Sequence, residues 1–158
     1  ARMPKPILNK NDIVEIVNNN ISLLNEVDKS VLIKFICAKK NLLIKCDNDQ
    51  ISRVFFNLIK NSIESIQEKF KKKGDFAKFI NIEILDKSDY IEINITDNGT
   101  GFSTDIIKNI TKPYFTTKPK GSGLGLSIVN KIINDHNGSI KFISNKNGAK
   151  VEIILPKN

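Results

Sequence analysis

The chain has 158 residues, of which 40% are apolar and 27% are charged, so it can bury the core of one domain. This composition excludes a disordered tail and a collagen-like rod. The net charge is +8, but only Arg2 and Arg53 among the 25 basic residues are Arg, and there is no Trp. Base readout and stacking of single strands favour Arg and aromatic side chains. We therefore expect no nucleic-acid partner and interpret the lysines mainly as solvated charge.

The cysteines and the apolar runs indicate the class of protein. Cys37 and Cys46 do not form a CxxC pair, so neither a disulfide scaffold nor a zinc ribbon is expected. No apolar run approaches the ~20 residues that cross a bilayer, and the opening lacks the apolar stretch of a signal peptide. We expect a reducing, cytoplasmic setting and a domain cut from a longer protein.

Hydrophobic periodicity predicts the elements in chain order. A helix is predicted over 12–26, followed by strands at 31–36 and 42–46 that we expect to pair as a hairpin around a Lys-Lys-Asn turn. A long helix is predicted over 48–70, capped at residue 47 or 48 and ended by Gly74. The remaining predicted elements are an antiparallel strand pair at 79–86 and 90–96, a short helix at 104–109, a helix at 124–135 and a hairpin of 139–144 with 149–155.

Strand pairs grouped between helices predict the α/β class. The grouping favours a mixed or mostly antiparallel sheet with helices on one face over a doubly wound βαβ repeat. No internal repeat is evident, and one domain accounts for the chain.

The first candidate site lies on the long helix. Asn57 and Asn61 are one turn apart and share one azimuth, while the stripe that includes Ser62 is predicted to pack on the sheet. A solvated polar stripe is the ordinary interpretation. Two amide oxygens one turn apart, however, also suit a hard cation such as Mg²⁺ that binds phosphate.

The second candidate site is the segment Asp97-Asn98-Gly99-Thr100-Gly101, which follows a predicted strand. A carboxylate at a strand end can accept a hydrogen bond from an exocyclic amine. The glycines permit positive φ and the close approach of a flat ligand. Alone, the segment could equally be a common turn.

Two further motifs lie before the helix predicted at 124–135. Gly121-Ser122-Gly123-Leu124-Gly125-Leu126 places exposed backbone N–H groups at a helix start, where phosphate is bound, although it matches neither the Rossmann fingerprint nor the P-loop. The segment 112–120 combines two threonines with lysines and could fold over an anionic ligand. Because 103–122 holds few large apolar residues, we expect it to be a lid that is mobile without ligand.

Taken in this order, the motifs resemble the catalytic ATP-binding domain of bacterial sensor histidine kinases, in the superfamily of DNA gyrase, the Hsp90 chaperones and the MutL repair proteins. Residues 56–64 resemble the N box, 97–101 the G1 box, 114–118 the F box and 121–126 the G2 box. The resemblance covers residues 7–156. The opening residues also resemble the junction after the dimerisation helices in nitrogen-regulation (NtrY-type) sensor kinases.

The resemblance implies a two-layer α/β sandwich of the Bergerat type, with a mixed sheet covered on one face by about three helices. Residues 1–10 would be a linker from a dimerisation and phosphoacceptor region, and 11–158 the catalytic domain. Asp97 would receive the adenine amino group, Asn61 would hold Mg²⁺, and Lys118 would approach the γ-phosphate of ATP. The other implied binding residues are Asn57, Gly99, Gly101, Phe115, Thr116, Thr117, Gly121, Ser122, Gly123, Leu124, Gly125 and Leu126.

Two departures from related proteins bear on the activity. ATP-hydrolysing relatives carry a Glu where this chain has Asn57, and an amide is no base at neutral pH, so water should be a poor nucleophile. Many family members also place Lys or Arg where this chain has Glu64. His136 ends a predicted helix, where we expect it to cap the helix rather than to accept phosphate. The phosphoryl group would then go to a histidine on a separate dimerisation domain, and onward to a response-regulator aspartate.

We expect the fragment to be a cytoplasmic monomer and its parent to be a homodimer and a candidate inner-membrane sensor. Three alternatives remain at this stage: an ATP-driven chaperone or topoisomerase module, a serine kinase of the anti-sigma type, and a non-catalytic nucleotide sensor or basic nucleic-acid binder. The missing Glu counts against the first two.

Overall fold

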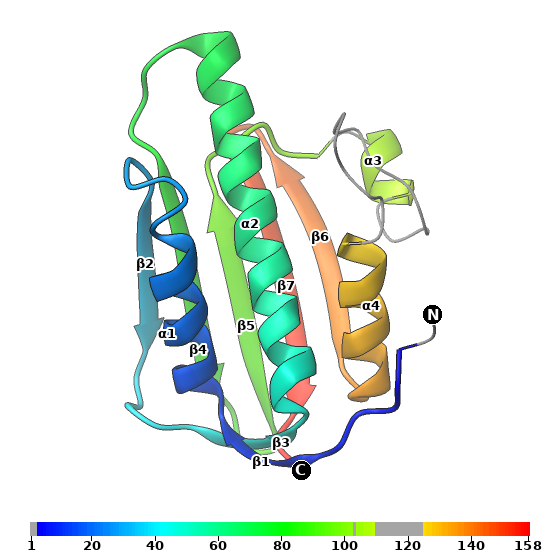
Figure 1. Cartoon of the computed structure of the whole chain (residues 1–158). Coiled ribbons are helices and arrows are strands. Elements are labelled where there is room, and N and C mark those ends of the chain that lie inside the picture. Colours follow the sequence, from blue (N-terminus) through cyan, green and yellow to red (C-terminus); the bar gives the residue numbers. More distant parts are fainter. Residues whose placement is uncertain (1–2, 103, 110–124) are drawn as a thin grey trace.

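The computed structural model describes residues 3–102, 104–109 and 125–158, which form a sheet layer and a helix layer (Figure 1). The elements of this part of the chain are, in order, β1 (Asn9–Asp12), α1 (Ile13–Leu24), β2 (Leu32–Cys37), β3 (Leu43–Cys46), α2 (Asn48–Lys73), β4 (Phe79–Asp86), β5 (Tyr90–Asp97), α3 (Thr104–Asn109), α4 (Gly125–Asp135), β6 (Ser139–Asn145) and β7 (Gly148–Pro156).

The larger sheet is mixed, as the sequence predicts. Its strand order is β2-β4-β5-β7-β6, in which β2 runs parallel to β4 and every other pair is antiparallel. Every second side chain of a strand points toward the helices. Burying one such aliphatic side chain stabilises the folded state by about 1.5–3 kcal/mol relative to leaving it exposed. The buried side chains on this inner face are Ile80, Ile82, Ile84, Ile91, Ile93, Ile95, Val151, Ile153 and Leu155.

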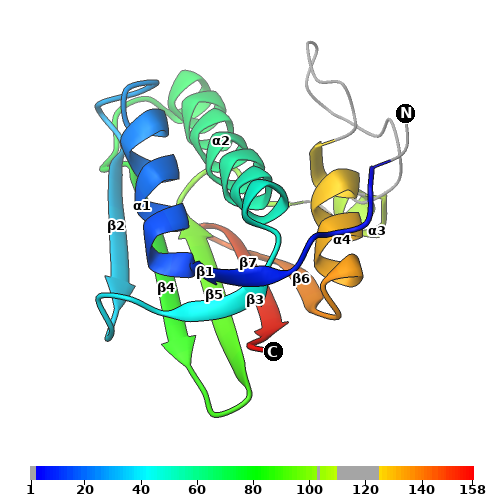
Figure 2. The same ribbon diagram turned by 60° about the horizontal axis from the view of Figure 1, so that its bottom comes forward.

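Helix α2 lies between α1 and α4 over the inner face of the sheet, as both views show (Figures 1 and 2). It begins at the predicted cap, where Gln50 N donates to Asp47 Oδ1 at 3.0 Å, and it ends at Gly74, whose φ is 79°. Only glycine adopts such a positive φ without strain, which is why glycine commonly ends helices. The prediction of a two-layer sandwich with about three covering helices is confirmed.

The predicted hairpin of 31–36 with 42–46 is wrong. Strand β2 pairs with β4, whereas β3 pairs antiparallel with β1, a short strand that the sequence analysis did not predict. The reason lies at the start of α1, where Asp12 Oδ1 accepts from both Val14 N and Leu42 N at 3.0 Å. The cap of α1 therefore holds the start of β3 beside β1 and away from β2. The predicted linker of residues 1–10 thus includes the first two residues of β1.

The segment before β1 runs from beside α4 past the first turn of α2 (Figure 2). Ile7 N donates to Asp47 Oδ2 at 2.9 Å, and Gln50 Nε2 donates to the carbonyl oxygen of Pro4 at 2.9 Å. These bonds attach the N-terminal segment to the end of the helix layer.

His136 connects the ends of two helices. Its side chain is buried, with Nδ1 2.8 Å from the carbonyl oxygen of Ile132, and Nε2 accepts from Asp47 N at 3.0 Å. Because Nε2 accepts, the proton of the neutral ring lies on Nδ1, which donates to the end of α4. The structure thus places His136 at a helix end, where a capping role was expected.

None of the helices in the described part of the chain combines the length and the apolar composition that a membrane crossing requires.

Candidate functional site

Asp97 is the last residue of β5 and lies beneath α2. Ile91, Ile93 and Ile95 point into the core, and the same alternation turns Asp97 inward, where its exposed fraction is only 6%. A carboxylate that is nine-tenths buried needs hydrogen-bond donors around it, because burial without partners costs several kcal/mol.

The donors around Asp97 come from three places. Ser62 Oγ of α2 donates to Oδ2 at 2.8 Å, and the backbone N–H of Gly99 donates to Oδ1 at 2.9 Å. Burial raises the pKa of Asp97 above its ordinary value, while the N–H of Gly99, the Ser62 hydroxyl, the N–H of Ala149 and the charge of Lys69 oppose that rise. The result is a buried acceptor of the kind that typically marks a functional site.

The loop after Asp97 packs closely on its surroundings. A Cβ on Gly99 would lie 2.3 Å from Ser65 Oγ and 2.8 Å from the backbone of the same residue. Gly101 has φ +76°, and a Cβ there would lie 2.8 Å from the carbonyl oxygen of Gly148. Glycine is therefore required at both positions for the loop to approach α2 and the β6–β7 turn, whereas the expected close approach of a flat ligand stays a prediction.

Side chains along α2 hold this loop in place. Ser65 Oγ accepts from Thr100 N at 2.9 Å, and Lys69 Nζ donates to the carbonyl oxygen of Asn98 at 2.8 Å. One surface of α2 thus carries the contacts to the loop that follows β5.

Asn57 and Asn61 lie further back on α2, both half-buried. Asn57 Nδ2 donates to the carbonyl oxygen of Gly125 at 3.3 Å, which connects α2 to the first residue of α4. The structure thereby brings the predicted N box next to the last glycine of the predicted G2 box. Leu126, the following residue, packs against the core, whereas a Cβ on Gly125 would meet nothing within 4 Å.

The donor set suits Mg²⁺ only together with phosphate. Within residues 3–102, 104–109 and 125–158, no cluster of three or more His, Cys, Asp or Glu could hold a metal ion. Mg²⁺ commonly keeps several waters and takes few protein oxygens plus substrate phosphates. A single amide oxygen such as that of Asn61 fits this requirement.

The other predicted site residues lie outside the described part of the chain, as does most of the predicted lid, so their assignments stay predictions. They are Phe115, Thr116, Thr117, Lys118, Gly121, Ser122, Gly123 and Leu124.

Ser62 is a site residue that the sequence analysis placed only on the sheet-packing stripe of α2. The available signal was its chemistry, because it is a hydroxyl among Ile, Val, Leu and Phe on that stripe. A buried hydroxyl requires a partner, and here the partner is Asp97.

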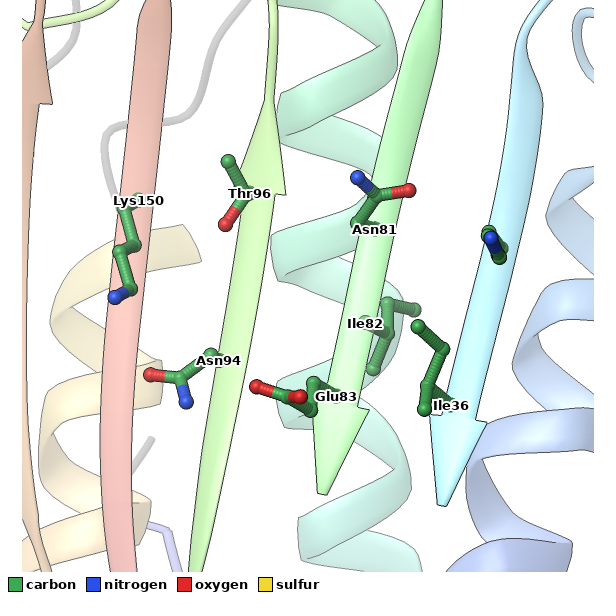
Figure 3. Close-up of a pocket in the computed structure, with 8 residues that line it drawn as sticks. Ile36, Asn81, Ile82, Glu83, Asn94, Thr96 and Lys150 are labelled. Atoms are coloured by element: carbon green, nitrogen blue, oxygen red, sulfur yellow. The ribbon is translucent and has the colours of Figure 1, made fainter. Parts of the chain in front are cut away.

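A shallow hollow of about 260 Å³ lies on the opposite face of the sheet. Figure 3 shows Asn81, Glu83, Asn94 and Lys150 on the side of the strands away from the helices. None of the predicted binding residues lines it, so we do not assign the site to this hollow.

Comparison with known proteins identifies the family to which this chain is similar. Residues 46–158 match the family described as "Histidine kinase-, DNA gyrase B-, and HSP90-like ATPase". A sensor histidine kinase described as NtrY-like from Rickettsia conorii is 34% identical over 97% of this chain, which covers 25% of that protein. Sporulation kinase E of Bacillus subtilis is 37% identical over 72% of this chain and 14% of its own length. The chain thus spans about a quarter or less of these two relatives.

Solved structures agree on the fold. The catalytic domain of histidine kinase ThkA superimposes with a TM-score of 0.83 at 26% identity, covering 96% of both chains. The mycobacterial sensor histidine kinase MprB superimposes with a TM-score of 0.81 at 18% identity, covering 95% of this chain and 97% of that one. The second likeness is one of fold alone.

Proposed function

The chain belongs to the family of histidine kinase-, DNA gyrase B- and HSP90-like ATPases, and from this premise we propose that it is the ATP-binding catalytic domain of a sensor histidine kinase. The observation that carries the proposal is the buried Asp97 carboxylate, held by Ser62 and Gly99 beneath the helix that also bears Asn57 and Asn61. The proposed acceptor for the base then lies beneath the same helix that carries the two amides proposed for the phosphate side.

The proposed roles follow the arrangement of these groups. Asp97 accepts from the adenine amino group, and Gly99 and Gly101 shape the base pocket. Asn61 would hold Mg²⁺, which would supply charge that neutralises the phosphates, and Asn57 would support the site through its bond to Gly125. The remaining nucleotide contacts are proposed for Phe115, Thr116, Thr117, Lys118, Gly121, Ser122, Gly123, Leu124, Gly125 and Leu126.

The proposed reaction is phosphoryl transfer to a histidine on a separate dimerisation domain. A ring nitrogen of that histidine forms a bond to the γ-phosphorus, the bond from γ-phosphorus to the bridging oxygen breaks, and ADP leaves. Asn57 offers no base to activate water at neutral pH, so hydrolysis should be slow. His136 is no substitute acceptor, because both ring nitrogens are engaged and its side chain is buried.

We propose a response-regulator aspartate as the next acceptor of the phosphoryl group. The parent is proposed to be a homodimeric sensor whose catalytic domain lies in the cytoplasm. In that second step a carboxylate oxygen forms a bond to phosphorus as the bond from phosphorus to the histidine ring nitrogen breaks.

Calorimetric titration with Mg²⁺ and a non-hydrolysable ATP analogue tests the proposal directly. We expect saturable binding and a rise in thermal stability, since a ligand at ~100 times its dissociation constant adds roughly 2.7 kcal/mol. Absence of both effects at millimolar nucleotide would overturn the proposal.

Phosphotransfer is tested by supplying the parent's histidine-bearing hairpin in trans with ATP and Mg²⁺. We expect an acid-labile, base-stable phosphoryl label on the hairpin and none on the catalytic domain. Brisk hydrolysis by the isolated domain, or a label on His136, would favour an ATPase module instead.

A further inference from the structure

Ser62 has a position that packing alone does not explain. It lies on the apolar stripe of α2 with an exposed fraction of 7%, and its hydroxyl is 2.8 Å from Asp97 Oδ2. An alanine would fill the same space without requiring a buried hydrogen-bond partner.

We propose that Ser62 is a positioning residue for purine selection, whose hydroxyl holds the Asp97 carboxylate so that one acceptor position faces the amino group of adenine. The inference rests on the proposed function and assigns to Ser62 a role in the base specificity of that site.

The donors around Asp97 leave acceptor capacity for a ligand. An ionised carboxylate has about four lone-pair positions. Ser62 donates to Oδ2 and Gly99 donates to Oδ1, so each oxygen has one neighbouring donor from the protein. The carboxylate can therefore still accept an N–H of an amino group, and the bond from Ser62 restricts which way Oδ2 presents its remaining lone pair.

The Ser62 hydroxyl also favours the ionised form of Asp97. Burial raises the pKa of this carboxyl, and the bond from Ser62 works against the rise. Among the elements packed around it, α2 contributes the charge of Lys69, while Ile80 of β4 and Ala149 of β7 carry none. Loss of the hydroxyl therefore moves the pKa of Asp97 upward with little to compensate.

Protonation would change which base the site accepts. An ionised Asp97 presents only acceptors, which suit the amino group of adenine and repel the O6 oxygen of guanine. A protonated Asp97 presents an O–H donor, which suits guanine O6 and opposes the adenine amine. The Ser62 hydroxyl thus keeps selection toward adenine as pH falls.

The test is titration of wild type and Ser62→Ala with Mg²⁺-ADP and Mg²⁺-GDP between pH 5 and 8. We expect the variant to lose about tenfold in its preference for ADP over GDP at the acid end. The pH at which half of the ADP affinity is lost should be higher than in wild type, because binding is lost as pH falls through a pKa that is now raised.

Ser65→Ala is the matched control. Ser65 lies one turn further along α2 and also contacts the loop after β5, through Thr100, but its hydroxyl makes no bond to Asp97. Because Ser65 holds the loop that shapes the base pocket, its loss should weaken ADP and GDP binding by the same factor. The preference for ADP over GDP, and the pH at which half of the ADP affinity is lost, should equal those of wild type.

If Ser62→Ala fails to fold, the shape-matched pair Ser62→Thr and Ser62→Val gives the same comparison. Threonine keeps the hydroxyl, so this variant should lose half of its ADP affinity at the same pH as wild type. Valine lacks the hydroxyl, so this pH should be higher.

The outcomes separate this inference from the proposed function. A wild type that binds no nucleotide overturns the proposed function. In a second outcome, wild type prefers ADP, and the variants without the hydroxyl keep the wild-type preference and lose half of their ADP affinity at the wild-type pH. This outcome overturns the role of Ser62 and leaves the proposed function intact. The role of Ser62 is also overturned if the variants lose ADP and GDP affinity equally while the pH at which half of the ADP affinity is lost stays unchanged. That result would show that Ser62 is merely structural.

Discussion

Asp47 directly follows β3 and Asp97 ends β5, and each carboxylate accepts a hydrogen bond from α2, yet their pKa values move in opposite directions. Burial acts to raise the pKa of Asp47, but hydrogen bonds from the backbone N–H groups of Ile7, Gln50 and Asp49 outweigh it and lower the pKa. Burial prevails at Asp97, whose pKa is raised despite its donors. Asp47 lies at the positive N-terminus of α2, and Asp97 lies under the middle of the helix.

The difference separates a stabilising carboxylate from the one that we propose to bind the base. The acceptor positions of Asp47 serve the backbone of α2 and of the N-terminal segment, so its charge supports the fold. Asp97 keeps a buried charge at a cost in folding free energy, and in the proposed role it retains an acceptor for the adenine amino group. Four experiments can break or sharpen this distinction.

The largest effect is expected from Asp97→Asn. An amide offers a donor and an acceptor where the adenine amino group needs an acceptor, so ADP affinity should fall by about 10- to 100-fold in calorimetric titration. Asp47→Asn is the control, because Asn also caps helices well, and its ADP affinity should stay at the wild-type value. Equal losses in both variants would contradict the distinction.

A carboxylate introduced at position 57 of α2 extends the comparison of Asp47 with Asp97. Asn57→Glu places a base where ATP-hydrolysing relatives have one, so the slow ATP hydrolysis of the isolated domain should rise by roughly 10- to 100-fold. The release of inorganic phosphate measures this rate, and Asn57→Gln, which adds length without a base, should leave it low. A Glu variant as slow as the Gln variant would show that the amide at position 57 is not what limits hydrolysis.

Asp47→Ala should act on stability instead of binding. Loss of the cap on α2 and of the acceptor for Ile7 should lower the free energy of unfolding by about 1–2 kcal/mol in urea titration. Asp49→Ala removes an exposed carboxylate from the same turn and should cost less, since that side chain is not the cap. If the Asp49 variant loses as much as the Asp47 variant, net charge and not capping is responsible.

The smallest effect is the pH dependence of stability without nucleotide. The pKa of Asp47 is lower in the folded state than in the unfolded state. Its contribution to the free energy of unfolding is therefore present above the unfolded-state pKa and is lost as pH falls through the folded-state pKa. The pKa of Asp97 is higher in the folded state, so its contribution is present below the unfolded-state pKa and is lost as pH rises through the folded-state pKa. From pH 3 to 7, wild type should therefore gain stability relative to Asp47→Asn and lose it relative to Asp97→Asn. Slopes of the same sign would contradict the opposed shifts.

Local patterns in the sequence were sufficient where structure depends on near neighbours. The alternation of Ile91, Ile93 and Ile95 predicts β5 and its pairing with β4, because the two strands are joined by a short turn. The helix from Asn48 and its stop at Gly74 follow from cap chemistry in the same way.

Contacts between distant residues were not predictable from local pattern. The partner of the strand at 42–46 is decided by Asp12, which captures Leu42 across 30 residues. Likewise, a helical wheel places Ser62 on the buried face of α2 but does not show that a carboxylate lies opposite. The motifs identified Asp97 as a candidate, and only the fold supplied its donors.

Asp97 and Ala149 are direct partners across β5 and β7, so the chain returns beside Asp97 after it has passed through α4 and β6. In polymer terms, this pairing closes one loop, and the predicted phosphate-binding motifs lie within it. Closing such a loop costs entropy that grows only with the logarithm of its length, about 0.6 kcal/mol for each doubling. A longer or shorter connection between Asp97 and α4 would therefore change the entropic cost of pairing β5 with β7 only slightly.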